Sequence, residues 1–264
     1  MSVKYEGIIP PIVTPFTASG EIDEEKIRRE MEICLDAGAD GISVGGSTGE
    51  GPTLRDEELT QLIKIAREYV KEGSDKTVVC GIMRTCTRDA VRAGKTAKEA
   101  GADAIMVTPT AYNVLVPNAE GMFDFYNTIS EEVQLPTIIY NVIPQNTIYV
   151  MLLPTIVQGA MGLVSGGAQI FGHEIRAIFD AFEAGENEKA KETFEPLYRF
   201  CKSTGQNGRI LPNSIMRPAI EAVSGIKLGN ARLPLAPPTD EEMKVNTVLD
   251  GVCRACWYCR TCQQ

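Results

Sequence analysis

The apolar residues of this chain fall in short runs that alternate with longer amphipathic segments. Six short runs are typical of buried strands, and they occupy residues 7–13, 41–44, 77–83, 103–108, 136–142 and 161–165. Helical periodicity marks the segments 23–37, 55–72, 87–100, 119–133 and 171–184. Strands that alternate with helices in this way predict βα units and a parallel sheet.

A repeated phrase marks the junctions from helix to strand. It reads LDAGADGISV from residue 35, KEAGADAIMV from residue 98 and VQGAMGLVS from residue 157. We interpret Gly38, Gly101 and Gly159 as left-handed caps that end a helix before a tight turn and a buried strand. Two helix starts are also marked, by the acidic first turn that begins at Asp23 and by Thr53 with the acidic residues after it.

The strand pattern stops after residue 185, and only helices are expected beyond it. They are predicted at about 186–203, 212–224 and 239–250. No linker separates the parts, so we expect one main domain with appendages. These are a (β/α) domain over 1–185, a helical region over 186–252 and a cysteine-rich tail over 253–264.

Composition excludes several classes of protein. The 264 residues include 26 Lys+Arg and 35 Asp+Glu, a net charge of −9, and 44% are hydrophobic. This balance is ordinary for a globular protein, and an acidic chain without a basic block is not expected to bind nucleic acid. The sequence contains no run of about 20 apolar residues, so no membrane span is predicted. Residues 1–10 do not resemble a signal peptide. Scattered cysteines agree with a cytoplasmic protein.

The loop Gly45–Glu50, with the sequence GGSTGE, is the first candidate for chemistry. It follows the predicted strand 41–44, so its backbone N–H groups and hydroxyls could bind a carboxylate or phosphate. The alternative is a plain glycine turn. Neither GxGxxG nor GxxxxGK[ST] follows a strand, which removes the main support for a dinucleotide or P-loop site. An open doubly wound sheet and a barrel both remain possible.

Five motifs in order resemble the dihydrodipicolinate synthase / N-acetylneuraminate lyase family. They are PIVTPF from residue 11, GGSTGE with GPTL from 45, VTP with Tyr112-Asn113 from 107, LPTIIYNV from 135 and RLPL from 232. The match covers most of residues 5–250. It implies a (β/α)8 TIM-type barrel with a C-terminal helical region, assembled as a homo-oligomer (dimer or tetramer). It also implies aldol chemistry between pyruvate and an aldehyde through a lysine Schiff base, without a cofactor or metal.

The resemblance also implies which residues act. Ser47 and Thr48 match the loop that binds the carboxylate of pyruvate, and Gly46 and Val164 are further candidates for substrate binding. Thr48 would also belong to a proton relay. Tyr140 matches the tyrosine that passes protons to and from the reacting oxygens. Because the pKa of a free phenol is about 10, this role at neutral pH requires hydrogen-bonding partners around the hydroxyl.

Tyr112 is the candidate for a second relay tyrosine, which this family donates across a subunit contact. The family often reads TPYYN where this chain reads TPTAYN, so the alternative is a partly buried loop tyrosine. In the synthases an arginine after the Tyr140 strand holds the second substrate, whereas residues 143–147 contain none. This argues for an aldehyde or oxo acid other than aspartate semialdehyde.

The Schiff-base lysine itself is missing. An imine needs a neutral amine, which the family places on the strand after Tyr140. Here no lysine lies between Lys98 and Lys189, and Lys227 follows a helix in the C-terminal region. Gly38 and Gly101 are 63 residues apart, and Gly101 and Gly159 are 58 apart, each about two βα units. If the third phrase leads into strand eight, about two units are missing near residue 150.

Two further features have structural alternatives. Cys253, Cys256, Cys259 and Cys262 have the spacing of an iron–sulfur or zinc ligand set, but they could equally form a stripe on a helix end or a divergent terminus. We expect no metal there. His173, the single histidine, is interpreted as a helix-start residue.

Three hypotheses follow from these observations. The chain could be a lyase or synthase of the family, a non-catalytic oxo-acid binder, or an incomplete form left by splicing or a gene-model gap.

Overall fold

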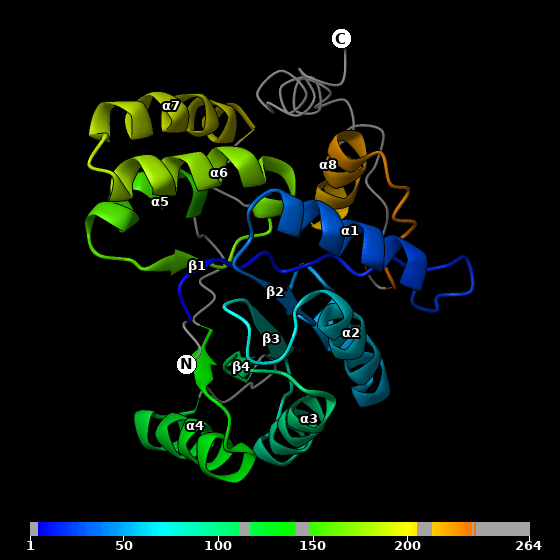
Figure 1. The fold of residues 1–264 in the computed structure, drawn as a ribbon. Coiled ribbons are helices and arrows are strands. Elements are labelled where there is room, and N and C mark those ends of the chain that lie inside the picture. The colour runs from blue at the N-terminus through cyan, green and yellow to red at the C-terminus, as the bar shows by residue number, and fades with distance from the viewer. Residues whose placement is uncertain (1–4, 111–116, 141–147, 205–212, 234, 236–264) are drawn as a thin grey trace. The chain divides into compact units, whose positions relative to one another are not determined.

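The structure is a computed structural model that describes residues 5–110, 117–140, 148–204, 213–233 and 235 (Figure 1). Its chain falls into two compact units. The first unit takes in Met1–Tyr5, Pro11–Thr14 and Gly41–Val142, and the second takes in Glu6–Pro10, Pro15–Asp40 and Ile143–Gln264. The predicted boundary at residue 185 stays a prediction.

The first unit contains a parallel four-stranded sheet. Its order is β2-β3-β4-β5, formed by β2 (Gly41–Val44), β3 (Thr77–Ile82), β4 (Ala104–Val107) and β5 (Thr137–Ile139). All residues of β2, β3 and β4 are buried, which explains why these strands read as continuous apolar runs. The residues of β5 are less buried, because β5 lies at the edge.

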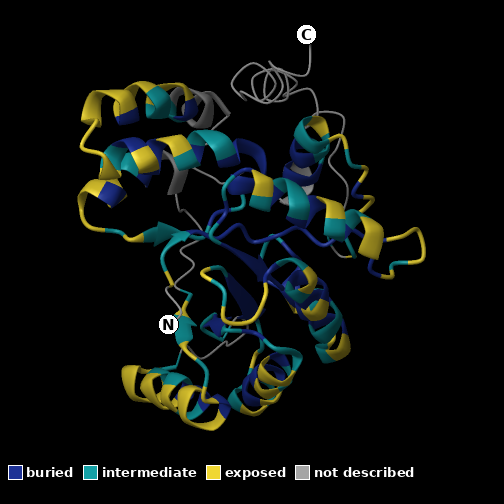
Figure 2. Ribbon diagram, viewed as in Figure 1, coloured by how far each residue is buried: buried dark blue, intermediate teal, exposed yellow. Residues whose placement is uncertain are grey.

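Three helices pack along this sheet, namely α2 (Asp56–Tyr69), α3 (Thr87–Ala100) and α4 (Ala119–Val133). Figure 2 shows buried residues along the strands and on the inward sides of these helices. Helices α3 and α4 approach closely, since a Cβ at Gly94 would lie 2.7 Å from Val133 Cγ2. An ion pair of 2.8 Å between Lys95 and Glu132 also joins them.

The second unit pairs the first strand of the chain with the last. Strand β1 (Gly7–Ile8) is parallel to β6 (Gly162–Leu163). Its helices are α1 (Glu24–Asp36), α5 (Ile148–Val157), α6 (Ala168–Glu183), α7 (Asn187–Thr204) and α8 (Asn213–Ser224). Helix α6 packs against α1, α7 and α8, and it is kinked at Phe171. The Asp40 carboxylate accepts the Ile8 N–H at 2.7 Å and pairs with Arg176 of α6.

The element order is that of a (β/α)8 barrel that lacks about two βα units between β5 and β6. Parallel pairing of the first and last strands belongs to a closed barrel, because a doubly wound sheet keeps those strands apart. The three glycine caps are confirmed, with φ of +92° at Gly38, +103° at Gly101 and +96° at Gly159. Helix α1 starts at Asp23 and its acidic first turn, as predicted, and the Asp23 side chain also caps the helix.

Some predicted boundaries were wrong. Thr53 does not begin α2 but lies in a short 3₁₀ helix, η1 (Gly51–Thr53), and its hydroxyl donates to the Glu50 carbonyl. The N-cap is Arg55, whose N–H donates to the Glu58 carboxylate at 2.8 Å. The helix predicted at 239–250 and the cysteine tail lie outside the described residues. Among the described helices, none is long and apolar enough to cross a membrane.

One buried charge on α1 is unexpected. Glu30 is fully buried, and no described residue gives a hydrogen bond to either carboxylate oxygen. Burial raises the pKa of Glu30 to about 8. Cys34, one turn later, is also buried, and its thiol pKa is raised by burial and by the nearby Glu30. Both side chains lie on the same buried face of α1 as Ile27 and Met31.

Candidate functional site

The loop Gly45–Glu50 follows β2 at the carboxyl edge of the first unit's sheet. Tyr140 follows β5 directly, so it belongs to the same edge. In parallel α/β proteins this edge is where ligands bind, because the loops after the strands gather there. The structure therefore puts three of the predicted residues, Ser47, Thr48 and Tyr140, at one edge of one sheet.

Glycines allow the loop to fold back against the neighbouring strand. Gly45 has a φ of +66°, which favours glycine. A Cβ at Gly81 of β3 would lie 2.5 Å from the Gly45 carbonyl oxygen, and a Cβ at Gly51 would lie 1.9 Å from the same atom. The close approach of these three backbones requires the absence of side chains.

Hydrogen bonds hold the loop in one shape. The buried Thr14 hydroxyl donates to the Gly49 carbonyl at 2.7 Å. Within the loop, the Gly51 N–H donates to the Gly46 carbonyl at 3.0 Å. Ser47 and Thr48 are half-buried, and the Ser47 hydroxyl donates to the sulfur of Met83 at 4.0 Å. The fixed loop can thus present donors that need little reorganisation on binding.

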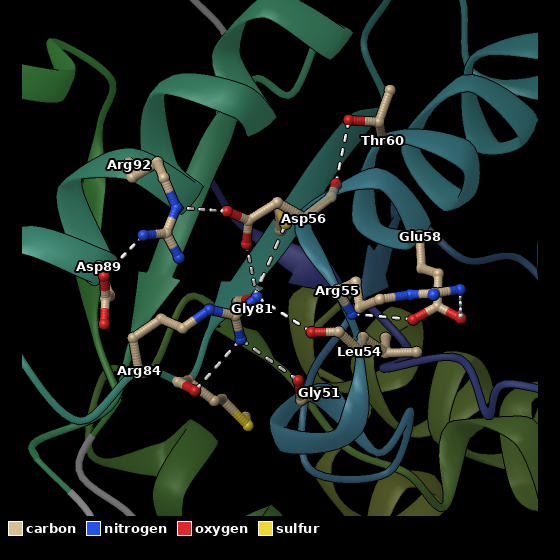
Figure 3. A network of polar contacts seen from close by, with 12 residues as sticks. Gly51, Leu54, Arg55, Asp56, Glu58, Thr60, Gly81, Arg84, Asp89 and Arg92 are labelled. Atoms are coloured by element: carbon tan, nitrogen blue, oxygen red, sulfur yellow. Dashed lines mark hydrogen bonds and ion pairs between the residues drawn. The ribbon is translucent and has the colours of Figure 1, made fainter.

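Arg84, just after β3, braces the segment that follows the loop (Figure 3). Its guanidinium donates to the Gly51 carbonyl at 3.4 Å and to the Leu54 carbonyl at 3.1 Å. It also pairs with Asp56 at the start of α2, at 2.8 Å, with both side chains largely buried. Arg92 of α3 binds the other oxygen of Asp56 at 2.8 Å. This network fixes the end of the loop to β3 and α3.

Tyr140 is anchored by its backbone, because its N–H donates to the Val107 carbonyl of β4 at 2.8 Å. Its side chain is half-buried. Among the described contacts, no hydrogen bond joins the side chains of Thr48 and Tyr140. Tyr112 lies outside the described residues. Val164 follows β6 in the second unit, so its position relative to the loop is not defined.

No described lysine has the surroundings of a Schiff-base nucleophile. Such an amine must be desolvated, or lie beside another cation, to become neutral. None of the lysines whose burial the structure describes is buried. Lys227 is 85% exposed and pairs with Glu221 at 3.3 Å. Lys95 and Lys98 are exposed on α3, as predicted.

Sequence reasoning missed Thr14 and Arg84. Thr14 lies within the PIVTPF motif, and only this motif could have indicated from the sequence that Thr14 belongs to the site. Arg84 and Asp56 are 28 residues apart, so no local pattern pairs them. His173 was predicted at a helix start, but α6 begins at Ala168 and His173 lies in its second turn. In the part of the chain that the structure describes, no three potential metal ligands cluster, and the tail cysteines lie outside that part.

Comparison with known proteins shows the family. The chain matches the dihydrodipicolinate synthetase family over residues 4–158 and 148–250. A 4-hydroxy-tetrahydrodipicolinate synthase from Citrifermentans bemidjiense is 30% identical, over 88% of this chain and 93% of that protein. Another, from Halalkalibacterium halodurans, is 28% identical, over 91% of this chain and 95% of the relative. The crystal structure of a dihydrodipicolinate synthase from Bacillus anthracis matches with a TM-score of 0.81 at 28% identity, covering 94% of this chain and 99% of that one.

The same comparisons measure the missing segment. The alignment with the Halalkalibacterium relative spans 286 positions but includes 91% of this chain, or about 240 of 264 residues. Thus about 46 positions (286 − 240) hold no residue of this chain. The two stretches of the family match meet at 148–158, where the sequence predicts the loss. Its size is somewhat below two average βα units of about 30 residues. The chain is a shortened member of the dihydrodipicolinate synthetase family.

Proposed function

We propose that this chain binds a pyruvate-like oxo acid at the loop Gly45–Glu50 and forms no Schiff base with it. The observation that carries the proposal is the fixed loop at the carboxyl edge of the sheet, in which Ser47 and Thr48 are only half-buried. A carboxylate would accept hydrogen bonds from Ser47, Thr48 and the backbone N–H groups of the loop. Because the net charge is −9, local donors rather than the overall field must hold the anion.

The other predicted site residues complete the proposed pocket. Tyr140 would donate a hydrogen bond to the keto oxygen, a role supported by its position on the same sheet edge. Gly46 would let the substrate approach the backbone, and Val164 would contribute an apolar wall. Tyr112 would serve as the second relay tyrosine, donated by another copy of the chain. These roles rest on the family resemblance.

The missing lysine limits the chemistry. Aldol cleavage or condensation through an imine needs a buried amine, and no described lysine provides one. The chain would therefore act as a non-catalytic oxo-acid-binding paralogue. If it accepts a second substrate, the absence of arginine from residues 143–147 favours an aldehyde other than aspartate semialdehyde. A homo-oligomer in the cytoplasm, as the family resemblance implies, belongs to the same proposal.

The missing segment supports a second candidate, an incomplete form of an active lyase or synthase. The family match divides in two near residue 150, and the alignment with one relative has about 46 positions without a residue of this chain. Sequencing the transcript across Val150 decides between the candidates. An insert that encodes a strand with a lysine would restore the enzyme, whereas an uninterrupted transcript favours the paralogue.

Calorimetric titration with pyruvate tests the binding proposal. We expect saturable binding to the unmodified chain and at least about tenfold weaker binding to Thr48→Val, because a hydrogen bond to a charged group is lost. Thr60→Val is the matched control, since the Thr60 hydroxyl donates only to the Asp56 carbonyl within α2. Absence of binding, or equal loss in both variants, would contradict the proposal.

A further inference from the structure

In the described part of the first unit, helix α4 and strand β5 border an exposed groove. A groove of about 470 Å³ lies between them. Thr137 and Ile139 of β5 line one wall. The other wall is an uncharged stripe at helical spacing along α4, made of Ala119, Met122, Phe123, Tyr126, Asn127 and Ser130. Phe123 is 68% exposed and Ile139 is 60% exposed, which is unusual for large apolar side chains in one groove.

The outer edge of β5 has no strand partner among the described residues. The Pro136 carbonyl and the Tyr140 N–H bond to β4, so alternate residues of β5 face that neighbour. Thr137 and Ile139 therefore direct their backbone N–H and C=O groups to the opposite side. No described residue pairs with them there. An open edge of this kind is a template for another strand.

The packing in the rest of the first unit indicates which kind of segment would bind at this groove. Strand β4 pairs in parallel with β5, while α3 packs on the flank of α4 through Gly94 and Lys95. Within the first unit, each strand from β2 to β4 therefore has a further parallel strand beside it, and α3 has a further helix beside it. The described sheet ends at β5, and the described helix layer ends at α4. The relatives have about 46 residues at positions that this chain lacks, which is long enough for a strand and a helix.

Charge argues against a second copy of this chain as the occupant. The charged residues of α4 are all exposed acids, namely Glu120, Asp124, Glu131 and Glu132, and of these Glu132 pairs with Lys95 of α3. Two copies placed stripe against stripe would bring acids close to acids, which opposes association. A helix with basic residues beside its apolar stripe would instead be attracted.

We propose that the α4–β5 groove is a docking surface for a strand–helix segment of a different polypeptide. The strand of the partner pairs in parallel with the open edge of β5. The helix of the partner lays an apolar stripe, flanked by lysine or arginine, along the stripe of α4. The proposal does not depend on oxo-acid binding, because it uses no residue of the loop Gly45–Glu50.

Two synthetic fluorescein-labelled peptides test this surface. Each has an alternating valine–threonine strand, a glycine turn and an amphipathic helix with a leucine stripe, and they differ only in lysine or glutamate flanks. We expect the lysine-flanked peptide to bind saturably in fluorescence anisotropy and to weaken as salt rises. Phe123→Glu should weaken binding at least about tenfold. Leu233→Glu, which changes a side chain 85% exposed elsewhere, should not.

Charge reversal gives a sharper outcome. Asp124→Lys should weaken binding of the lysine-flanked peptide and strengthen that of the glutamate-flanked one. The proposal is overturned if neither peptide binds to the unmodified chain. It is also overturned if each peptide binds Phe123→Glu with the same affinity as it binds the unmodified chain. It is also overturned if sedimentation shows self-association that Phe123→Glu abolishes, because the groove would then take a second copy.

Discussion

Replacing Glu30 by methionine is expected to raise the free energy of unfolding, by an amount that grows as the pH rises. The carboxylate is buried without a hydrogen-bond partner among the described residues, and burial raises its pKa to about 8. Methionine fills a similar volume and adds no charge to the apolar face of α1. The substitution therefore removes a cost that is large only when Glu30 is ionised.

The direction of the pH dependence follows from linkage. A folded-state pKa above the unfolded value, about 4.5, means that the folded chain holds the proton more tightly. Stability is then full below about pH 4.5 and is lost as the pH rises towards about 8. Each pH unit in this window costs about 1.4 kcal/mol. Between pH 5 and pH 8 the advantage of Glu30→Met should grow by about 4 kcal/mol.

Urea unfolding at pH 5, 6.5 and 8 measures this gain. Glu25→Gln is the matched control, because Glu25 is exposed in the first turn of the same helix and should change stability by only a few tenths of a kcal/mol. A Glu30→Met variant with the same pH profile as the unmodified chain would show that Glu30 is not ionised in a buried setting.

Removing the Asp56 carboxylate by Asp56→Ala is expected to lower the free energy of unfolding by about 2 kcal/mol, between the values for exposed and buried ion pairs. Arg84, whose side chain is only 13% exposed in the unmodified chain, would lose its charged partner. Burial alone would raise the pKa of Asp56, but hydrogen bonds from Arg84 and Arg92 outweigh it and lower the pKa. This stabilisation is complete above about pH 4 and is lost as the pH falls through the lower folded-state pKa.

The same variant tests whether the network supports the binding loop. Arg84 braces the carbonyls of Gly51 and Leu54, so Asp56→Ala should also weaken pyruvate binding. Asp75→Ala is the control, because Asp75 is exposed before β3 and should change stability by less than about 0.5 kcal/mol. Equal stability of the two variants in urea unfolding would contradict a structural role for the network.

Apart from helix α5, which was not among the predicted helices, the order of the described strands and helices could be predicted because local signals mark it. Buried parallel strands read as apolar runs, and the glycines at 38, 101 and 159 adopt the left-handed conformation that the repeated phrase indicates. The spacing of those glycines also indicates the loss of βα units, which the relatives confirm. These features can be predicted from residues that are close in sequence and from the spacing of the repeated phrase.

Features that depend on distant contacts could not be predicted. Thr53 precedes an acidic turn, yet it lies in η1, because the backbone from Gly51 to Leu54 is set by Arg84 rather than by capping. The pairing of Arg84 with Asp56 has no local pattern. Glu30 did have a signal, since it shares helical spacing with Ile27 and Cys34 on the apolar face. The roles of Ser47, Thr48 and Tyr140 remain predictions that binding experiments must test.

The most direct test of the central claim is borohydride reduction of the chain in the presence of pyruvate, followed by intact-mass measurement. Reduction converts an imine into a stable adduct, so a class I pyruvate aldolase treated in parallel should gain mass. We predict no added mass on this chain, because none of the lysines whose burial the structure describes is buried and none lies between Lys98 and Lys189. A pyruvate-derived adduct on one lysine would contradict the claim that this family member binds without forming an imine.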